Sequence, residues 1–230
     1  TAAGNFSSAQ TTLDGVLGRQ PNHATALYIY SELELARNRF DAALSRAQQA
    51  YELDPLSPWI NVNLAIVHFW RSEYQPALEA VQNAIRIDNN YTWAYVWQAK
   101  IFHRQGQLSA AITSMLQSAD IDSASVVNSA YTGLLYMEIG DEEQAEYWFR
   151  HTASLLGDTP QARFWQGLQR FTQPQQTTDV ARQLMLGLPL LDNRIFSLLP
   201  LLYQNYLHGD DSEAAIRFLQ SRIADTAPEV

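Results

Sequence analysis

Residues 74–88 read YQPALEAVQNAIRID, and residues 40–54, which lie 34 positions earlier, read FDAALSRAQQAYELD. Both stretches start with an aromatic residue, continue with an Ala-Leu pair and end with an aliphatic residue followed by Asp. A pattern that returns after a fixed interval indicates an internal repeat, in which each copy is one supersecondary unit.

Small residues follow the same interval through most of the chain. One series consists of Ala9, Ala43, Ala77, Ala111 and Ala145. A second series consists of Ser31, Ala65, Ala99, Gly133 and Gly167. Only small side chains allow two helices to cross closely, so the two series predict the crossing point of two antiparallel helices in each repeat. One such pair cannot bury its apolar face alone, and several pairs must therefore stack.

These stretches resemble the second helix and exit turn of the tetratricopeptide repeat (TPR), and the resemblance covers roughly residues 6–170. It implies an all-α fold, a right-handed superhelical solenoid of antiparallel helix pairs. Glu34 and His68 depart from the family pattern, because an aromatic or aliphatic residue is usual at their position. Glu142 likewise stands where an aromatic residue is usual.

The repeat pattern predicts how the chain is divided. Residues 1–20 form the second helix of a truncated repeat, so we expect the parent protein to continue towards its N-terminus. Four regular repeats then fill residues 21–158, and two degenerate repeats in residues 159–230 cap the array. The predicted helices of the regular part lie near 6–18, 23–37, 40–53, 57–71, 74–87, 91–104, 108–121, 124–139 and 142–156. Further helices are expected near 178–187, 193–208 and 211–223, after a loop at 172–178.

Composition and motifs exclude several classes of function. The net charge of −9 argues against a nucleic-acid partner for this piece, because nucleic-acid binders concentrate Lys and Arg. There is no cysteine, and no motif for a catalytic nucleophile, a phosphate loop or a metal site is present. The five histidines are not paired at helical spacing. We therefore expect a protein that is not an enzyme, with no catalytic residue, cofactor or metal.

The family resemblance implies that the first helix of each repeat lines a concave groove. Position by position, the predicted binding residues are Tyr28, Trp59, Val62, Asn63, Phe69, Trp93, Trp97, Lys100, His103 and Arg104. The lysine and asparagine clamp with which some co-chaperone TPRs hold an acidic chaperone tail is absent, since only Asn63 agrees with it. Lys100, His103 and Arg104 share a helix face and could hold a carboxylate. Alternatively they complement the helix dipole, and the tryptophans pack between repeats.

The expected function is therefore a non-catalytic module that binds a protein or peptide with apolar anchors and an acidic residue. Residues 53–64, LDPLSPWINVNL, resemble the TPR tails of bacterial winged-helix transcriptional regulators. This implies the sensor or effector part of a larger bacterial regulatory protein, periplasmic if the parent is tethered to a membrane by a part outside this chain and otherwise cytoplasmic. The alternatives are an assembly or scaffolding factor, a homodimer among them, and a helical accessory domain of an enzyme.

Overall fold

The computed structural model describes residues 2–158, and their side chains from Phe6 onward. This part of the chain contains nine α-helices and no strand. The chain divides into two compact parts, Thr1–Ile121 and Asp122–Val230. The predicted helices near 178–187, 193–208 and 211–223, the loop at 172–178, Gly167 and the cap at 159–230 lie outside the described residues.

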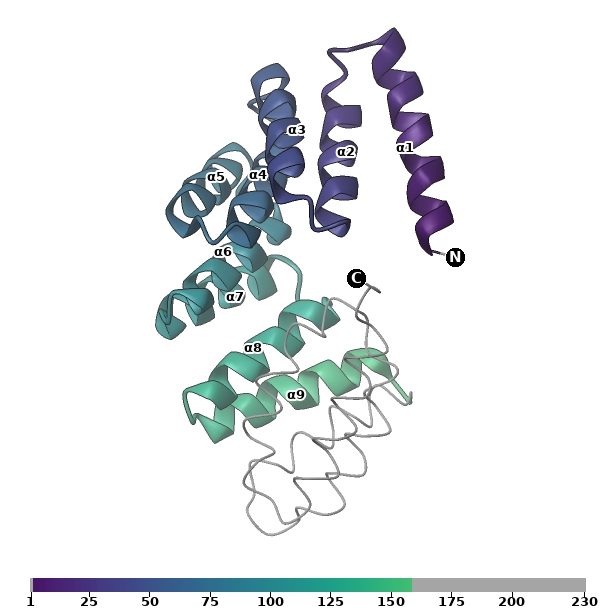
Figure 1. Ribbon diagram of the computed structural model, residues 1–230. Coiled ribbons are helices and arrows are strands. Elements are labelled where there is room, and N and C mark those ends of the chain that lie inside the picture. Colours follow the sequence, from purple (N-terminus) through teal and green to yellow (C-terminus); the bar gives the residue numbers. More distant parts are fainter. Residues whose placement is uncertain (1, 159–230) are drawn as a thin grey trace. The chain divides into compact units, whose positions relative to one another are not determined.

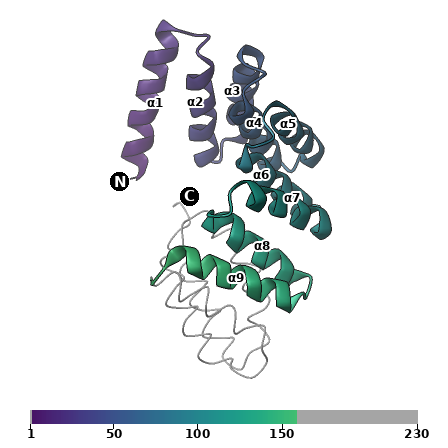
Figure 2. The same ribbon diagram turned by 180° about the vertical axis from the view of Figure 1, so that it is seen from behind.

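Seven helices build the N-terminal part, and successive helices run antiparallel (Figures 1 and 2). They are α1 (Ala2–Arg19), α2 (Ala24–Ala36), α3 (Phe40–Leu53), α4 (Pro58–Trp70), α5 (Tyr74–Ile87), α6 (Thr92–Arg104) and α7 (Leu108–Ile121). The C-terminal part contributes α8 (Val126–Glu138) and α9 (Glu142–Leu156). From α2 onward, each helix begins and ends within two residues of its predicted position. Helix α1 begins four residues before the predicted start, at Ala2 rather than residue 6.

The small residues lie where the two helices of each repeat cross. Ala43, Ala77, Ala111 and Ala145 are completely buried, as are Ser31, Ala65 and Ala99. At Gly133 a Cβ atom would come within 2.6 Å of the Phe149 ring, so only glycine fits at that crossing of α8 and α9. The predicted close crossing is thus confirmed from α2 onward.

Ala9 differs from the other members of its series because it is exposed. In each later repeat the equivalent alanine lies on the second helix and is covered by the first helix of the same repeat, as Ala43 on α3 is covered by α2. Helix α1 is the first helix of the described part, so no described helix fills that place.

The turn inside each repeat uses a left-handed residue. Asn38, Ser72, Gly106 and Gly140 follow one another at intervals of 34 residues and have φ values of 57°, 62°, 73° and 78°. At each turn the next N–H group reaches five residues back, as from Arg39 to the carbonyl oxygen of Glu34 at 2.9 Å. This is the Schellman arrangement, in which a left-handed residue ends the helix and satisfies its last carbonyl groups.

Two of the three departures from the family pattern, Glu34 and His68, have polar or charged partners nearby, and the third, Glu142, lies in the first turn of α9. Glu34 is buried, and its carboxylate lies 3.6 Å from both Arg37 and Arg39. His68, one repeat later, lies 2.6 Å from Glu73, which in turn bonds Arg71 at 3.0 Å. Arg39 and Glu73 occupy equivalent positions in successive repeats, and so do Glu34 and His68. One repeat therefore pairs Glu34 with Arg39, and the next pairs His68 with Glu73. Buried polar groups need such partners.

The turns predict opposite effects for two Gly→Ala substitutions. Gly106→Ala should lower the free energy of unfolding by about 1 kcal/mol, because alanine is strained at positive φ. A steric clash should not add to this loss, since a Cβ atom there would meet no neighbour. Gly15→Ala, within α1, should raise it by about 0.5–1 kcal/mol, because alanine favours the helix. Urea denaturation followed by circular dichroism measures both. Equal signs for the two variants would contradict the turn geometry.

Glu73 predicts a pH dependence of stability. The bond with His68, and then Arg71, lowers the pKa of Glu73 below its ordinary value of 4.5. A carboxyl group with a lowered pKa stabilises the fold fully above its unfolded pKa, and this contribution is lost as the pH falls through the lowered value. The wild-type protein should therefore lose its advantage in melting temperature over Glu73→Gln as the pH falls below 4.5, the ordinary pKa of the group. Glu79→Gln, which removes a carboxylate bonded only to the amide of Gln75, is the control and should show no such change.

Candidate binding surface

The candidate surface is the inner face formed by α2, α4 and α6, the first helices of three successive repeats. Helix α4 contacts both α2 and α6, so the three lie side by side within the N-terminal part. Residues 34 positions apart form rows across this face. One row consists of Ile29, Asn63 and Trp97, and another of Glu32, Ile66 and Lys100. Each row contributes one side chain from each helix.

The predicted binding residues differ in their exposure. Three are buried, namely Val62, Asn63 and Trp97. Five are half-buried, namely Tyr28, Phe69, Trp93, Lys100 and His103. Two are exposed, namely Trp59 and Arg104. The inner face is therefore lined at the surface by half-buried aromatic and basic side chains, with Val62, Asn63 and Trp97 beneath them.

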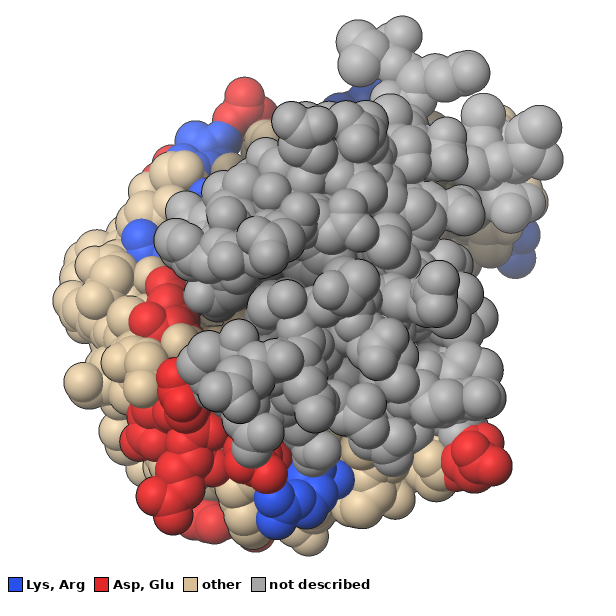
Figure 3. All heavy atoms as spheres, turned by 90° about the horizontal axis from the view of Figure 1, so that it is seen from below, with Lys and Arg blue, Asp and Glu red and all other residues tan. Residues whose placement is uncertain are grey.

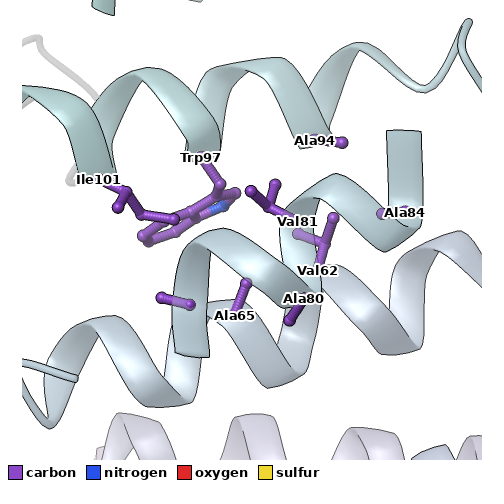
Figure 4. Packing of buried hydrophobic residues seen from close by; sticks show 9 residues of the cluster. Val62, Ala65, Ala80, Val81, Ala84, Ala94, Trp97 and Ile101 are labelled. Carbon is purple, nitrogen blue, oxygen red and sulfur yellow. The ribbon is translucent and has the colours of Figure 1, made fainter. Parts of the chain in front are cut away.

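Trp97 shows that the tryptophans have different roles. Its side chain is 7% exposed and packs in a core cluster with Val62, Val81 and Ile101 (Figure 4). Trp59, by contrast, is 47% exposed. Trp93 lies between these extremes, half-buried against the same cluster. The packing hypothesis therefore holds for Trp97, and the role of Trp59 in binding stays a prediction.

An aromatic group with two cations connects α4 to α6. The Phe69 ring meets Trp97 edge to face at 5.4 Å between centroids, and Trp93 meets Trp97 at 6.4 Å. The Lys100 ammonium lies 4.3 Å from the Trp97 centroid, and the Arg104 guanidinium lies 5.9 Å from that of Phe69. Cation–π contacts at these distances contribute about 0.5–2 kcal/mol each. Five of the predicted residues are thus brought together.

Tyr28 lies on the α2 side of the face, away from this group. Its hydroxyl donates a hydrogen bond of 3.0 Å to Glu32. Burial first, and then the negative charge of Glu32, raises the pKa of Tyr28 above its ordinary range. Tyr28 therefore stays a neutral donor at physiological pH, directed at a carboxylate.

Asn63 is the most unusual residue of the face. It is 2% exposed, and neither its Nδ2 nor its Oδ1 atom has a hydrogen-bond partner. One repeat later in the same row, the buried Nε1 atom of Trp97 also has none. Leaving such a group unpaired costs about 1–3 kcal/mol. Two successive positions of one row thus hold polar groups that no described residue satisfies.

Comparisons with known proteins agree with the repeat geometry. The family model described as Tetratricopeptide repeat matches residues 2–58 and 33–92. The fold is a TPR solenoid. The crystal structure of MamA is similar at 22% identity with a TM-score of 0.58, over 67% of this chain and 91% of that chain.

Two further solved structures show the same fold. TTC0263, a TPR protein of Thermus thermophilus, is 19% identical with a TM-score of 0.61, over 79% of this chain and 96% of that chain. The Cut9–Hcn1 hetero-tetramer of the APC/C contains a chain that is 16% identical with a TM-score of 0.73, over 99% of this chain. This chain spans 45% of the length of that one. Identities this low concern the fold alone.

The sequence-based prediction of the TPR face missed Trp70, at the C-terminal end of α4. Trp70 is 51% exposed and lines two hollows of about 670 and 340 Å³. It occupies the repeat position of Arg104, which was among the predicted residues, so the same phase argument would have found it. Asn38 and Phe40, at the turn from α2 to α3, line both hollows as well.

Other kinds of site find no support in residues 2–158. No group of three His, Asp or Glu side chains there could hold a metal ion, and no helix there is long and apolar enough to span a membrane. Acidic side chains gather on one face beside a smaller basic patch (Figure 3). Asp141, Glu142, Glu143 and Glu146 stand together at the start of α9, where Asp141 caps the helix by accepting a bond from the Gln144 N–H group.

The difference between the tryptophans predicts their energetic roles. Trp97→Ala should lower the free energy of unfolding by about 3–5 kcal/mol, because it leaves a cavity in the core cluster. Trp59→Ala should lower it by less than about 1 kcal/mol, because the side chain is half in solvent. Chemical denaturation of both variants measures the difference. Similar losses for the two would contradict the assignment of Trp97 to the core.

Proposed function

We propose that the inner face of α2, α4 and α6 binds an extended segment of a protein partner, without catalysis. The observation that carries this proposal is the buried, unpartnered carboxamide of Asn63. A carboxamide can donate to a peptide carbonyl group and accept from a peptide N–H group at once. A bound peptide would therefore supply both partners that Asn63 lacks.

The second unpartnered group extends this recognition along the row. Adjacent packed helices lie about 8–10 Å apart, and an extended peptide rises about 3.3 Å per residue. Asn63 on α4 and Trp97 on α6 would thus meet peptide groups about three residues apart. Both groups are covered by neighbouring side chains in the free protein. Binding must include small side-chain rotations, which are common at interfaces.

The side chains around this row indicate which segment would fit. Half-buried Phe69 and Trp93, with exposed Trp59, offer aromatic surface for apolar anchors. Lys100 and Arg104 lie over that surface and offer positive charge for an acidic residue. Aromatic residues beside a cation are typical of interface hot spots.

The role of the module in its parent protein is a further part of the proposal. We favour the sensor or effector part of a larger bacterial regulatory protein, because residues 53–64 resemble the tails of winged-helix regulators. A winged helix encoded upstream of residue 1 would support this role, and a catalytic domain there would contradict it. The Cut9–Hcn1 hetero-tetramer supports the scaffold alternative, in which this face holds an assembly together.

Two buried asparagines on α4 provide the test of the binding face. Asn61 is completely buried, and its Nδ2 atom donates to the carbonyl oxygens of Pro55 and Ser57, both at 2.9 Å. Its Oδ1 atom has no partner among the described residues, so Asn61 differs from Asn63 in the two bonds that its Nδ2 atom makes. Asn61→Leu should therefore lower the free energy of unfolding by about 1–3 kcal/mol. Asn63→Leu removes no internal bond, so it should leave stability unchanged or raise it slightly.

Peptide binding should respond in the opposite way. Peptides selected from a displayed library of random dodecapeptides should bind Asn63→Leu at least about tenfold more weakly, because two hydrogen bonds are lost. The folded Asn61→Leu variant should bind them with wild-type affinity. Calorimetry measures affinity, and the NMR signals of the Asn63 amide and the Trp97 indole report the contact. Unchanged affinity in Asn63→Leu, or failure to select any peptide, would overturn the proposal.

A further inference from the structure

The smaller hollow, of about 340 Å³, lies between α2 and α4 on the inner face. Its described lining consists of Glu32, Leu35, Ala36, Asn38, Phe40, Ile66 and Trp70. Its size is at the lower end of the range for small-ligand pockets, about 300–1,000 Å³. Two aromatic rings, three aliphatic side chains, the Asn38 carboxamide and one carboxylate surround it. The only ionisable lining group among the described residues is therefore negative.

Glu32 forms no ion pair with any residue of the described part of the chain. No basic side chain in the described part of the chain lies within 4.0 Å of its carboxylate, whose one hydrogen bond there comes from Tyr28. The field of this carboxylate reaches further, because Glu32 contributes, after burial, to the raised pKa of both Tyr28 and Tyr91. Glu32 itself is exposed, so solvent weakens its attraction for a cation, and contact of the cation with the aromatic rings of the hollow would add to that attraction.

The cations around the neighbouring larger hollow are already paired. Arg71 bonds both Asp41 and Glu73. Arg39 lies 3.6 Å from Glu34. Neither arginine lines the smaller hollow, and neither neutralises Glu32. The charge that Glu32 presents is therefore left for a group from outside the described chain.

We propose that the hollow between α2 and α4 holds the cationic side chain, arginine or lysine, of the bound partner segment. Glu32 would pair with the cation, and Trp70 and Phe40 would contact it through their rings. Such aromatic contacts add to the attraction of the carboxylate, and they strengthen as the cation is desolvated. The inference rests on the proposed function and extends it, because it adds a basic anchor at the α2 end to the acidic residue expected near Lys100 and Arg104.

The two charges would also set the direction of the bound segment. Glu32 and Lys100 occupy the same row, with Ile66 between them, so the row changes from negative through apolar to positive. A segment with a basic residue at one end and an acidic residue at the other fits this row in one orientation only. The reversed orientation would place like charges together, which is costly.

Single amino-acid probes test the hollow without the rest of the groove. N-acetylarginine amide carries the guanidinium, and N-acetylcitrulline amide is a neutral analogue of nearly the same shape. The NMR signal of the Trp70 indole N–H group reports binding of each. We expect the arginine probe to bind at least about tenfold more tightly, a ratio that corresponds to about 1.4 kcal/mol.

Three variants make the result decisive. In Glu32→Gln the arginine-to-citrulline ratio should fall to about one, whereas Glu79→Gln, an equal charge change on α5, should preserve it. Trp70→Ala, in which the indole signal is lost and binding is followed instead by the backbone amide signal of Ile66, should weaken both probes. Equal affinities in the wild type, a ratio retained in Glu32→Gln, or no response of Trp70 would overturn the inference.

The two proposals can fail separately. The probes are too short to reach from the hollow to α6, so Asn63→Leu should leave their affinity unchanged. Probe binding without any Asn63-dependent peptide would sink the proposed function and leave a cation site. Asn63-dependent peptides with no preference for arginine or lysine, and no probe binding, would sink the cation site alone.

Discussion

The close crossing of two helices at a pair of small residues is the constraint on which the structure depends. Ala65 on α4 and Ala77 on α5 are both completely buried, and Gly133 on α8 leaves no room for a single added carbon atom beside Phe149. Because the backbones approach this closely, the larger side chains of each pair are directed towards the next repeat. Stacking then buries what one pair cannot bury alone.

The sequence predicted most of the fold because the repeat is local. A fixed interval of 34 residues determines the helix, the turn and the crossing point together, so each prediction supported the others. The sequence was less informative about Ala9, because the burial of this position requires a preceding helix. It also gave no warning that Asn38 and Ser72 would share the left-handed conformation of Gly106 and Gly140, because neither residue is a glycine.

The candidate site was harder to predict. The position of a residue in the repeat indicates on which helix face it lies, but not how deeply its side chain is buried. Trp59 and Trp97 both belong to the predicted inner face, yet one is half exposed and the other is part of the core. The unpaired state of Asn63 depends on the absence of suitable neighbours from other helices. Such an absence is a three-dimensional property, and it identifies the residue at which stability is sacrificed.

The ion pairs of Glu34 and His68 have a consequence for assembly of the stack. Repeats that look alike can dock in the wrong order, a known failure of repeat proteins during folding. Here Glu34 pairs with Arg39 in one repeat, whereas His68 pairs with Glu73 in the next. A helix pair formed one repeat out of step would place Glu34 opposite another carboxylate in a buried site. In these two repeats the charges therefore favour pairing of α2 with its own second helix, α3, over pairing with α5.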